Sequence, residues 1–191
     1  MRSGLKIMKV IFLDRDGVIN KYPGHYNYVT SWKEFKFLPR AKPALKKLTK
    51  SGFKIFILSN QAGVSKGIYS QKALDLITQK MLRELKKFGA QIAGVHYCTH
   101  LKEDNCACRK PKTGLIKKVI SGLTEKKNAP DLSDSYFIGD SIVDVETGKA
   151  AGLKTMLLFS GRESPQNQKD WQTLPDFTAR DLSEAVDIIL K

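Results

Sequence analysis

The sequence predicts an α/β domain with a doubly wound, mostly parallel sheet that carries helices on both faces. Short runs of β-branched and aromatic residues alternate along the chain with amphipathic helical segments. Such alternation is typical of right-handed βαβ crossovers, which place helices on both faces of a parallel sheet. A length of 191 residues with 41% hydrophobic and 27% charged residues suits one folded domain over 1–191. A large multidomain protein and a disordered chain are both excluded.

Strands are expected where a short apolar run stops at polar or glycine-containing sequence, over 9–13, 54–58, 92–97, 135–138 and 154–158. Helices are expected between them, over 44–50, 71–88 and 115–123, and a further helix should contain 144–151. Their ends are set by Pro43 in a first turn, Ser70 as an N-cap, and Gly52 and Gly152 just past the last turns. A short leader over 1–8 and a polar loop over 160–174 complete the chain. The second helix should bury one apolar face: Leu74, Ile77, Met81, Leu85 and Phe88.

The charge balance is strongly basic, with 33 Lys and Arg against 19 Asp and Glu and a net charge of +14. Because the lysines are spread as singles and pairs, we interpret them as solvated helix faces rather than as a nucleic-acid patch. No apolar run approaches the roughly 20 residues of a membrane-spanning helix, and the first residues lack the apolar stretch of a secretory signal. We therefore expect a cytoplasmic protein with no membrane or nucleic-acid partner.

The cysteines point to a metal site. All of them lie within 98–108, and their odd number argues against a disulfide framework. With one histidine they make a Cys₃His set that suits a closed structural zinc site, the alternative being unliganded thiols: Cys98, His100, Cys106 and Cys108. Arg109 and Lys110 follow Cys108 directly, so a metal that fixes Cys108 would also fix where these two cations point.

Polar residues follow the expected strands at the edge of the sheet where parallel α/β folds bind ligands. Asp14 and Asp16 come after the first strand, Ser59 after the second and Asp140 after the fourth. A cluster of carboxylates is how Mg²⁺ is usually held in proteins, which favours metal-assisted phosphoryl transfer. Asp144, one helical turn after Asp140, either steadies the waters of the metal or is simply a favourable acid at a helix N-terminus.

A phosphoryl group in transfer also needs donors for its oxygens. Ser59 offers a hydroxyl, Lys110 offers a point charge, and Arg109 can make a bidentate contact to a second anion.

Taken together, these motifs resemble the haloacid dehalogenase superfamily of phosphatases. The matching residues are the nucleophile motif Asp14-x-Asp16-Gly17-Val18, the phosphate-binding motif Leu58-Ser59-Asn60-Gln61, the cation Lys110, and the metal motif Gly139-Asp140-x-x-x-Asp144. The resemblance spans about 9–161 and implies a Rossmann-like fold of this superfamily. No large insertion separates Gly17 from Ser59 or Gly67 from Lys110, so we expect no large cap domain, an exposed site and a monomer.

Within the superfamily the chain is most similar to the heptose bisphosphate phosphatases. Three segments carry this similarity: Asn60-Gln61-Ala62-Gly63-Val64 with Gly67, Tyr28-Val29 with 35–39, and the zinc loop running into Cys108-Arg109-Lys110-Pro111. Histidinol-phosphatase is the next most similar family, and it and other small-metabolite phosphomonoesterases stay as alternatives. The chain departs from the heptose pattern at Ser141, where that family often has Lys, which leaves one cationic substrate contact open.

The resemblance implies hydrolysis of a sugar phosphate through an aspartyl-phosphate. Asp14 would be the nucleophile, and Asp16 would protonate the leaving sugar oxygen and then deprotonate water. Mg²⁺ would be held by Asp14, the main-chain carbonyl of Asp16, and Asp140. Ser59 and Lys110 would hold the phosphoryl oxygens. Substrate contacts are expected from Tyr22, Pro23, Gly24, His25, Ser59, Asn60, Gln61, Arg109, Lys110 and Ser141.

Two other classes of protein fit parts of the pattern. A phosphoacceptor signalling domain also has paired acids after its first strand, but its acceptor Asp ends a later strand, where this chain has Ser59-Asn60-Gln61. A zinc-containing nucleic-acid-binding protein fits the basic charge and the Cys/His set, but the order and gaps of that set match no finger or knuckle spacing. We therefore predict a Mg²⁺-dependent phosphatase with a structural zinc, acting on a small phosphorylated metabolite.

Overall fold

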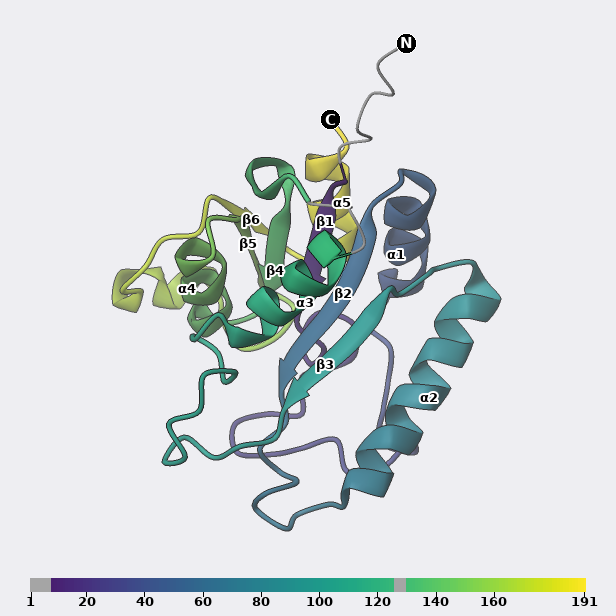
Figure 1. The fold of residues 1–191 in the computed structure, drawn as a ribbon, viewed down its shortest axis with the longest axis vertical. Coiled ribbons are helices and arrows are strands. Elements are labelled where there is room, and N and C mark those ends of the chain that lie inside the picture. Colours follow the sequence, from purple (N-terminus) through teal and green to yellow (C-terminus); the bar gives the residue numbers. More distant parts are fainter. Residues whose placement is uncertain (1–7, 126–129) are drawn as a thin grey trace.

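The computed structural model describes residues 8–125 and 130–191, and in them a six-stranded sheet is flanked by helices (Figure 1). The strands are β1 (Val10–Leu13), β2 (Lys54–Asn60), β3 (Gly94–Cys98), β4 (Tyr136–Gly139), β5 (Lys154–Leu158) and β6 (Phe177–Ala179). Their order across the sheet is β3-β2-β1-β4-β5-β6, and all neighbouring pairs are parallel. Because the chain winds outward from β1 in both directions, the sheet is doubly wound, which confirms the predicted fold class.

The helices that connect the strands are α1 (Ala41–Lys50), α2 (Gln71–Phe88), α3 (Gly114–Glu125), α4 (Ile142–Ala150) and α5 (Leu182–Ile189). Side chains of β1 alternate between two apolar layers because successive residues of a strand point to opposite faces. Ile11 and Leu13 belong to a core shared with α1, α2 and α5, whereas Val10 and Phe12 pack in a second core with α3. Both faces of the sheet are therefore covered.

Several predicted boundaries are shifted in the structure. Helix α1 begins at Ala41 rather than 44, so Pro43 is its third residue, where a missing N–H still costs no intrahelical hydrogen bond. Strand β2 continues to Asn60 rather than ending at 58, and β3 runs from Gly94 to Cys98 rather than over 92–97. The helix predicted to contain 144–151 is α4, which ends at Ala150. The predicted apolar face of α2 is buried except at Phe88, which is 41% exposed at the end of the helix. The prediction that Phe88 is buried is therefore wrong.

The prediction missed the last two elements of the chain, β6 and α5. Strand β6 has three residues, of which only Ala179 is buried, so it lacks an alternating pattern. The predicted polar loop over 160–174 contains a short 3-10 helix, Pro165–Asp170. Of the predicted leader over 1–8, residues 1–7 lie outside the described residues, and Met8 pairs with Pro130. In the described part of the chain no helix is long and apolar enough to cross a membrane.

Because all neighbouring strands are parallel, their carboxyl ends lie at one end of the sheet, which the arrowheads of β2 and β3 mark at the lower end of Figure 1. The connections 14–40 and 61–70 emerge there, and among the described residues neither contains a named helix or strand. No cap domain is therefore seen over this end of the sheet, and the side chains that follow β1, β2 and β4 face an open cleft.

Candidate active site

Three carboxylates meet at the carboxyl ends of β1 and β4. Asp14 follows β1, Asp140 follows β4, and Asp144 lies in the first turn of α4, with one oxygen of each within 4.8 Å of the others. Asp140 and Asp144 are buried, and the Asp14 side chain is 14% exposed. Burial raises the pKa of Asp14 to about 6, although Lys110 lowers it. Burial, followed by the charges of Asp14 and Asp144, also raises the pKa of Asp140.

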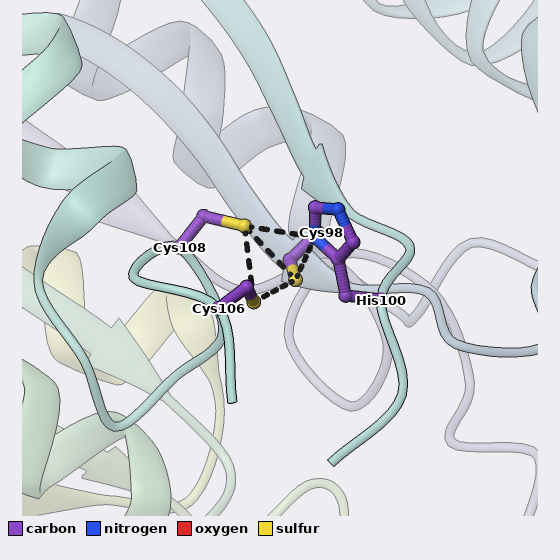
Figure 2. A group of neighbouring side chains, drawn as sticks. All are labelled: Cys98, His100, Cys106 and Cys108. Carbon is purple, nitrogen blue, oxygen red and sulfur yellow. Dashed lines mark hydrogen bonds between the residues drawn. The ribbon is translucent and has the colours of Figure 1, made fainter. Parts of the chain in front are cut away.

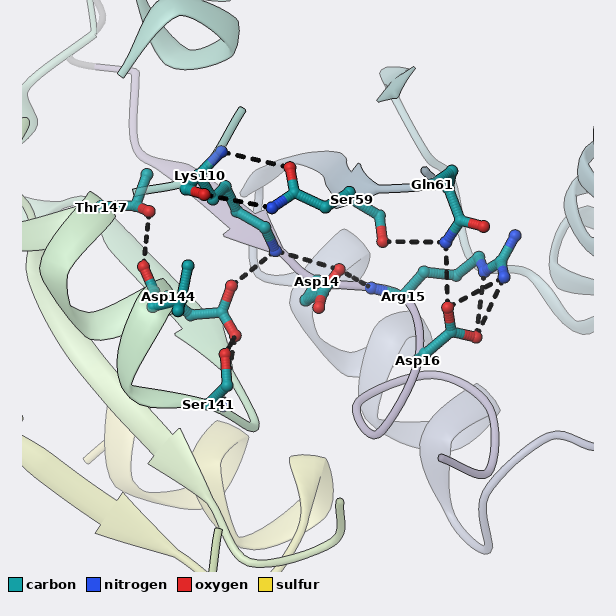
Figure 3. A network of polar contacts seen from close by, with 11 residues as sticks. Asp14, Arg15, Asp16, Ser59, Gln61, Lys110, Ser141, Asp144 and Thr147 are labelled. Atoms are coloured by element: carbon teal, nitrogen blue, oxygen red, sulfur yellow. Dashed lines mark hydrogen bonds and ion pairs between the residues drawn. The ribbon is translucent and has the colours of Figure 1, made fainter. Parts of the chain in front are cut away.

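Lys110 partly compensates this negative charge (Figure 3). Its Nζ lies 3.1 Å from Asp14 Oδ1 and donates a hydrogen bond to Asp144 Oδ1 at 2.5 Å. Burial disfavours the charge on Lys110, but the two carboxylates outweigh that effect and raise its pKa. Three carboxylates against one ammonium leave an excess of negative charge in a largely buried space. A divalent cation with oxygen ligands would neutralise this excess, so the donor set fits Mg²⁺.

Asp144 acts as a helix cap and as a partner for Lys110. Its Oδ2 accepts hydrogen bonds from the backbone N–H and the hydroxyl of Ser141, at 3.2 and 2.7 Å, which completes a capping box at the start of α4. The prediction that it is a favourable acid at a helix N-terminus is therefore consistent with the structure. Its contact with the waters of a metal stays a prediction. The Ser141 hydroxyl, at the position of the expected Lys, is engaged in this cap.

The Asp16 carboxylate is held by a separate set of donors. The Arg15 guanidinium donates to both of its oxygens, at 2.9 and 3.0 Å from Nη2. Asn20 Nδ2 donates to Oδ1 at 2.7 Å and Gln61 Nε2 donates to Oδ2 at 2.9 Å. Arg15 is 0% exposed, and Nη1 has no hydrogen-bond partner among the described atoms. The carboxylate predicted to be the acid–base group is thus fixed from three directions.

The last two residues of β2, Ser59 and Asn60, have different roles. Ser59 Oγ accepts a hydrogen bond from Gln61 Nε2 at 3.2 Å, and the Ser59 hydroxyl lowers the pKa of Asp14. Asn60 instead holds the backbone of Lys110: its Oδ1 accepts from the Lys110 N–H at 3.1 Å and its Nδ2 donates to the Lys110 carbonyl at 3.2 Å. Asn60 therefore fixes the cation's segment to the end of β2, and its predicted contact with substrate stays a prediction.

Asp140 is enclosed by two glycines from distant loops. A Cβ at Gly17 or at Gly161 would overlap the Asp140 carboxylate. Gly17 also has φ +80°, in the left-handed region that favours glycine. The Arg162 N–H donates to Asp140 Oδ2 at 2.8 Å. The loops after β1 and β5 thereby fix the orientation of this carboxylate.

A cleft of about 860 Å³ opens above these groups. It is lined by all the residues predicted to contact substrate, namely Tyr22, Pro23, Gly24, His25, Ser59, Asn60, Gln61, Arg109, Lys110 and Ser141, and also by Asp14, Asp16 and Asp140. Four further cations line it that sequence reasoning missed: Lys66, Lys102, Lys112 and Arg162. In the sequence these four residues look like the other lysines and arginines of a basic chain, and only the folded structure brings them to the cleft.

The predicted zinc ligands lie together beside the cleft (Figure 2). Cys98 ends β3, and His100, Cys106 and Cys108 come from the loop after it. The sulfurs lie 3.2 to 3.6 Å apart, and His100 Nδ1 lies 3.2 Å from the Cys108 sulfur. A disulfide bond of about 2.05 Å is excluded by these distances. They approach the edge of a tetrahedron with Zn–S bonds of about 2.3 Å, so the set fits a zinc ion.

Comparisons with known proteins agree with this geometry. A family model described as polynucleotide kinase 3 phosphatase matches residues 9–151. A curated relative from Chlorobaculum tepidum, D-glycero-D-manno-heptose-1,7-bisphosphate 7-phosphatase, is 35% identical over 93% of this chain and 92% of its own length. A relative from Helicobacter pylori, D-glycero-beta-D-manno-heptose-1,7-bisphosphate 7-phosphatase, is 34% identical over 95% of this chain and 97% of its own length.

A solved structure of D,D-heptose 1,7-bisphosphate phosphatase from B. bronchiseptica, complexed with magnesium and phosphate, superposes with a TM-score of 0.84. It is 29% identical, and the match covers 96% of this chain and 98% of that one. The sheet order, the carboxylates after β1 and β4 and the buried lysine define a phosphatase of the haloacid dehalogenase superfamily. Given relatives of this similarity over nearly their full length, the chain belongs to the heptose 1,7-bisphosphate 7-phosphatase family.

Proposed function

We propose that the protein hydrolyses D-glycero-D-manno-heptose 1,7-bisphosphate at the 7-position, releasing the heptose 1-phosphate and inorganic phosphate. The curated relatives carry this activity in their names. The observation that carries the proposal is the buried group formed by Asp14, Asp140 and Lys110 beneath a cleft whose rim is cationic. Such a group suits transfer of a phosphoryl group from an anionic substrate.

In the proposed mechanism an oxygen of Asp14 attacks phosphorus and the bond between phosphorus and the sugar oxygen breaks. Asp16 gives its proton to the leaving oxygen, and in the second step it takes a proton from the water that hydrolyses the aspartyl-phosphate. Lys110 and the Ser59 hydroxyl would bind the phosphoryl oxygens. The closeness of Lys110 Nζ to Asp14, 3.1 Å, supports this arrangement.

Two metals are part of the proposal. Asp14, Asp140 and the main-chain carbonyl of Asp16 would hold Mg²⁺, which when bound screens the repulsion between carboxylate and phosphate. Cys98, His100, Cys106 and Cys108 would hold a structural zinc that takes no part in the chemistry. Thiols kept reduced for such a site suit the cytoplasm, which supports the predicted location. The monomeric state stays a prediction that size-exclusion chromatography with light scattering would check.

The preference for a bisphosphate follows from the number of cations. Lys110 and Ser59 suffice for the reacting phosphate, which leaves Arg109 and the other cations of the rim for a second anion. Histidinol phosphate instead presents an ammonium group at its far end, which these cations repel. We expect kcat/KM to be at least about tenfold higher for the heptose bisphosphate, which corresponds to about 1.4 kcal/mol in transition-state binding.

The test is phosphate release from a panel of substrates with Mg²⁺ present. The panel contains both anomers of the heptose bisphosphate and histidinol phosphate. It also contains an oligonucleotide ending in a 3′-phosphate, because the matching family model is described as a polynucleotide kinase 3 phosphatase. The proposal expects the highest kcat/KM for one heptose anomer. An equal or higher value for histidinol phosphate or the oligonucleotide would overturn the substrate assignment and leave the phosphatase chemistry standing.

A further inference from the structure

Tyr69 lies outside the sequence motifs of the site but is hydrogen-bonded to one of their residues. It precedes Ser70, the N-cap of α2, and is 7% exposed. Its hydroxyl donates to Gln61 Oε1 at 2.6 Å. Gln61 Nε2 in turn donates to Asp16 Oδ2 at 2.9 Å and to Ser59 Oγ at 3.2 Å. One amide group therefore connects the phosphate-binding hydroxyl with the acid–base carboxylate (Figure 3).

The Tyr69 hydroxyl favours one of the two orientations of the Gln61 amide. An amide has one acceptor oxygen and two N–H donors on its nitrogen. When the phenol donates to Oε1, both hydrogens of Nε2 are directed to Asp16 and Ser59. In the reversed orientation Oε1 would face the Asp16 carboxylate, where two acceptors repel each other. Because Ser59 Oγ accepts from Gln61, the serine hydroxyl can use its own hydrogen on the Asp14 side of the site, where it lowers the pKa of Asp14 and where a phosphoryl oxygen would lie.

The Tyr69 ring is closely packed by its neighbours. A Cβ at Gly63 would overlap the Tyr69 ring, so the absence of a side chain at Gly63 leaves room for the ring. The Tyr28 ring packs on another side at a centroid distance of 6.1 Å. Burial raises the pKa of Tyr69 to about 12, so the hydroxyl keeps its proton at neutral pH and can act as a donor.

We propose that Tyr69 is a positioning residue for the phosphatase reaction, which fixes the Gln61 amide so that Ser59 and Asp16 are both oriented for phosphoryl transfer. This inference rests on the proposed function for the roles of Ser59 and Asp16. Tyr69 acts only through Gln61, since its hydroxyl bonds to the amide and not to either reacting residue.

The first variant is Tyr69→Phe, which keeps the ring and removes only the hydroxyl. We expect kcat to fall about tenfold, as for the loss of one well-placed hydrogen bond, with KM changed less than about twofold. Tyr136→Phe is the matched control, because Tyr136 begins β4 at the opposite end of the sheet from the cleft. Its kcat should equal that of the wild-type protein.

A double-mutant cycle separates positioning from a general loss of structure. Gln61→Ala should lower kcat by more than Tyr69→Phe does, and adding Tyr69→Phe to Gln61→Ala should change kcat by less than about twofold. A merely structural hydroxyl would lower kcat by the same factor in both backgrounds. That result, or a kcat of Tyr69→Phe equal to that of the wild-type protein, would overturn the proposal.

A measurement without substrate keeps this test apart from the substrate assignment. In ¹⁵N-labelled protein the side-chain amide signals of Gln61 are identified by their loss in Gln61→Ala. Tyr69→Phe should shift these signals and speed their exchange with water, because the amide loses the partner that fixes it. Unchanged Gln61 signals would overturn the positioning role. Failure of the wild-type protein to hydrolyse heptose bisphosphate would overturn the proposed function alone, and the cycle would then be run on 4-nitrophenyl phosphate.

Discussion

At the residue scale, two requirements oppose each other at Asp14. As the proposed nucleophile it would have to be ionised to attack phosphorus, yet it is mostly buried beside Asp140 and Asp144, with Lys110 as its ion-pair partner among the described residues. Its pKa is raised from 3.8 to about 6. The stability associated with its protonated form is therefore fully present below about pH 3.8 and is lost as the pH rises through about 6. At neutral pH the metal-free protein therefore lacks this contribution to its stability.

Replacing Asp14 by Asn should therefore separate activity from stability. We expect Asp14→Asn to abolish turnover and, in EDTA at pH 7.5, to raise the free energy of unfolding by about 1–3 kcal/mol relative to the wild-type protein. Mg²⁺ should raise the melting temperature of the wild-type protein and leave that of the variant nearly unchanged. Urea unfolding and thermal melts with and without Mg²⁺ measure both effects.

Asp187→Asn is the control for this experiment, because the Asp187 carboxylate is largely exposed and pairs with Lys47 far from the cleft. It should respond to Mg²⁺ as the wild-type protein does. Near wild-type Mg²⁺-dependent phosphatase activity in Asp14→Asn would contradict the nucleophile assignment. A clear loss of stability in EDTA would contradict the electrostatic explanation.

At the scale of elements, the segment from Cys98 to Lys110 is held at both of its ends. Cys98 belongs to β3 and pairs in register with Asn60 of β2, and the side chain of Asn60 holds the Lys110 backbone. The cluster of thiols lies between these two points. A zinc ion would therefore fix the conformation of a loop whose ends the sheet already fixes.

We predict about one zinc per chain, retained on dialysis. Cys108→Ser should lose the metal and lower kcat/KM about 10- to 100-fold, because Arg109 and Lys110 follow Cys108 directly. Elemental analysis and steady-state kinetics measure the two effects, and Ser121→Ala, on the exposed side of α3, serves as the variant that should keep both zinc and activity. Freshly purified protein without zinc and with all thiols freely titratable would refute the site.

The elements also show what a sequence can predict. Strands β1, β2 and β4 are largely buried, and polar or glycine residues lie at or just after their carboxyl ends, so their positions and the residues there were predictable from apolar runs and motifs. Strand β6 was not, because two of its three residues are exposed. The contact of Tyr69 with Gln61 was not predictable either, since it depends on how the 61–70 loop folds back. Local patterns carry no information on such contacts.

At the scale of the whole molecule, the basic charge acts at the cleft, because several cationic side chains line it. Lys66 lines it from the connection after β2, Lys102, Arg109 and Lys112 from the connection after β3, and Arg162 from the connection after β5. The chain as a whole carries a net charge of +14. A field of this sign attracts anionic substrates and raises the rate of their encounter with the site. The effect depends on ionic strength because salt screens it over about 10 Å.

We therefore expect kcat/KM for the heptose bisphosphate to fall several-fold between about 20 and 200 mM salt, with kcat nearly constant. A monophosphate of similar size, assayed under the same conditions, should show a smaller decrease because it carries less charge. Steady-state kinetics over a salt series with both substrates measures the difference. Equal salt dependence for the two would show that the rim cations play no part in substrate capture.

The enclosure of Asp140 limits how this protein can change during evolution. Gly17 and Gly161 lie far apart in the sequence, yet neither has room for even a methyl group, because the same carboxylate occupies the space beside both. Gly122 of α3 has open space around it and carries no such limit. Each of these two loops is thus constrained at one position, and a descendant that loses either glycine must also change the position of the carboxylate that follows β4.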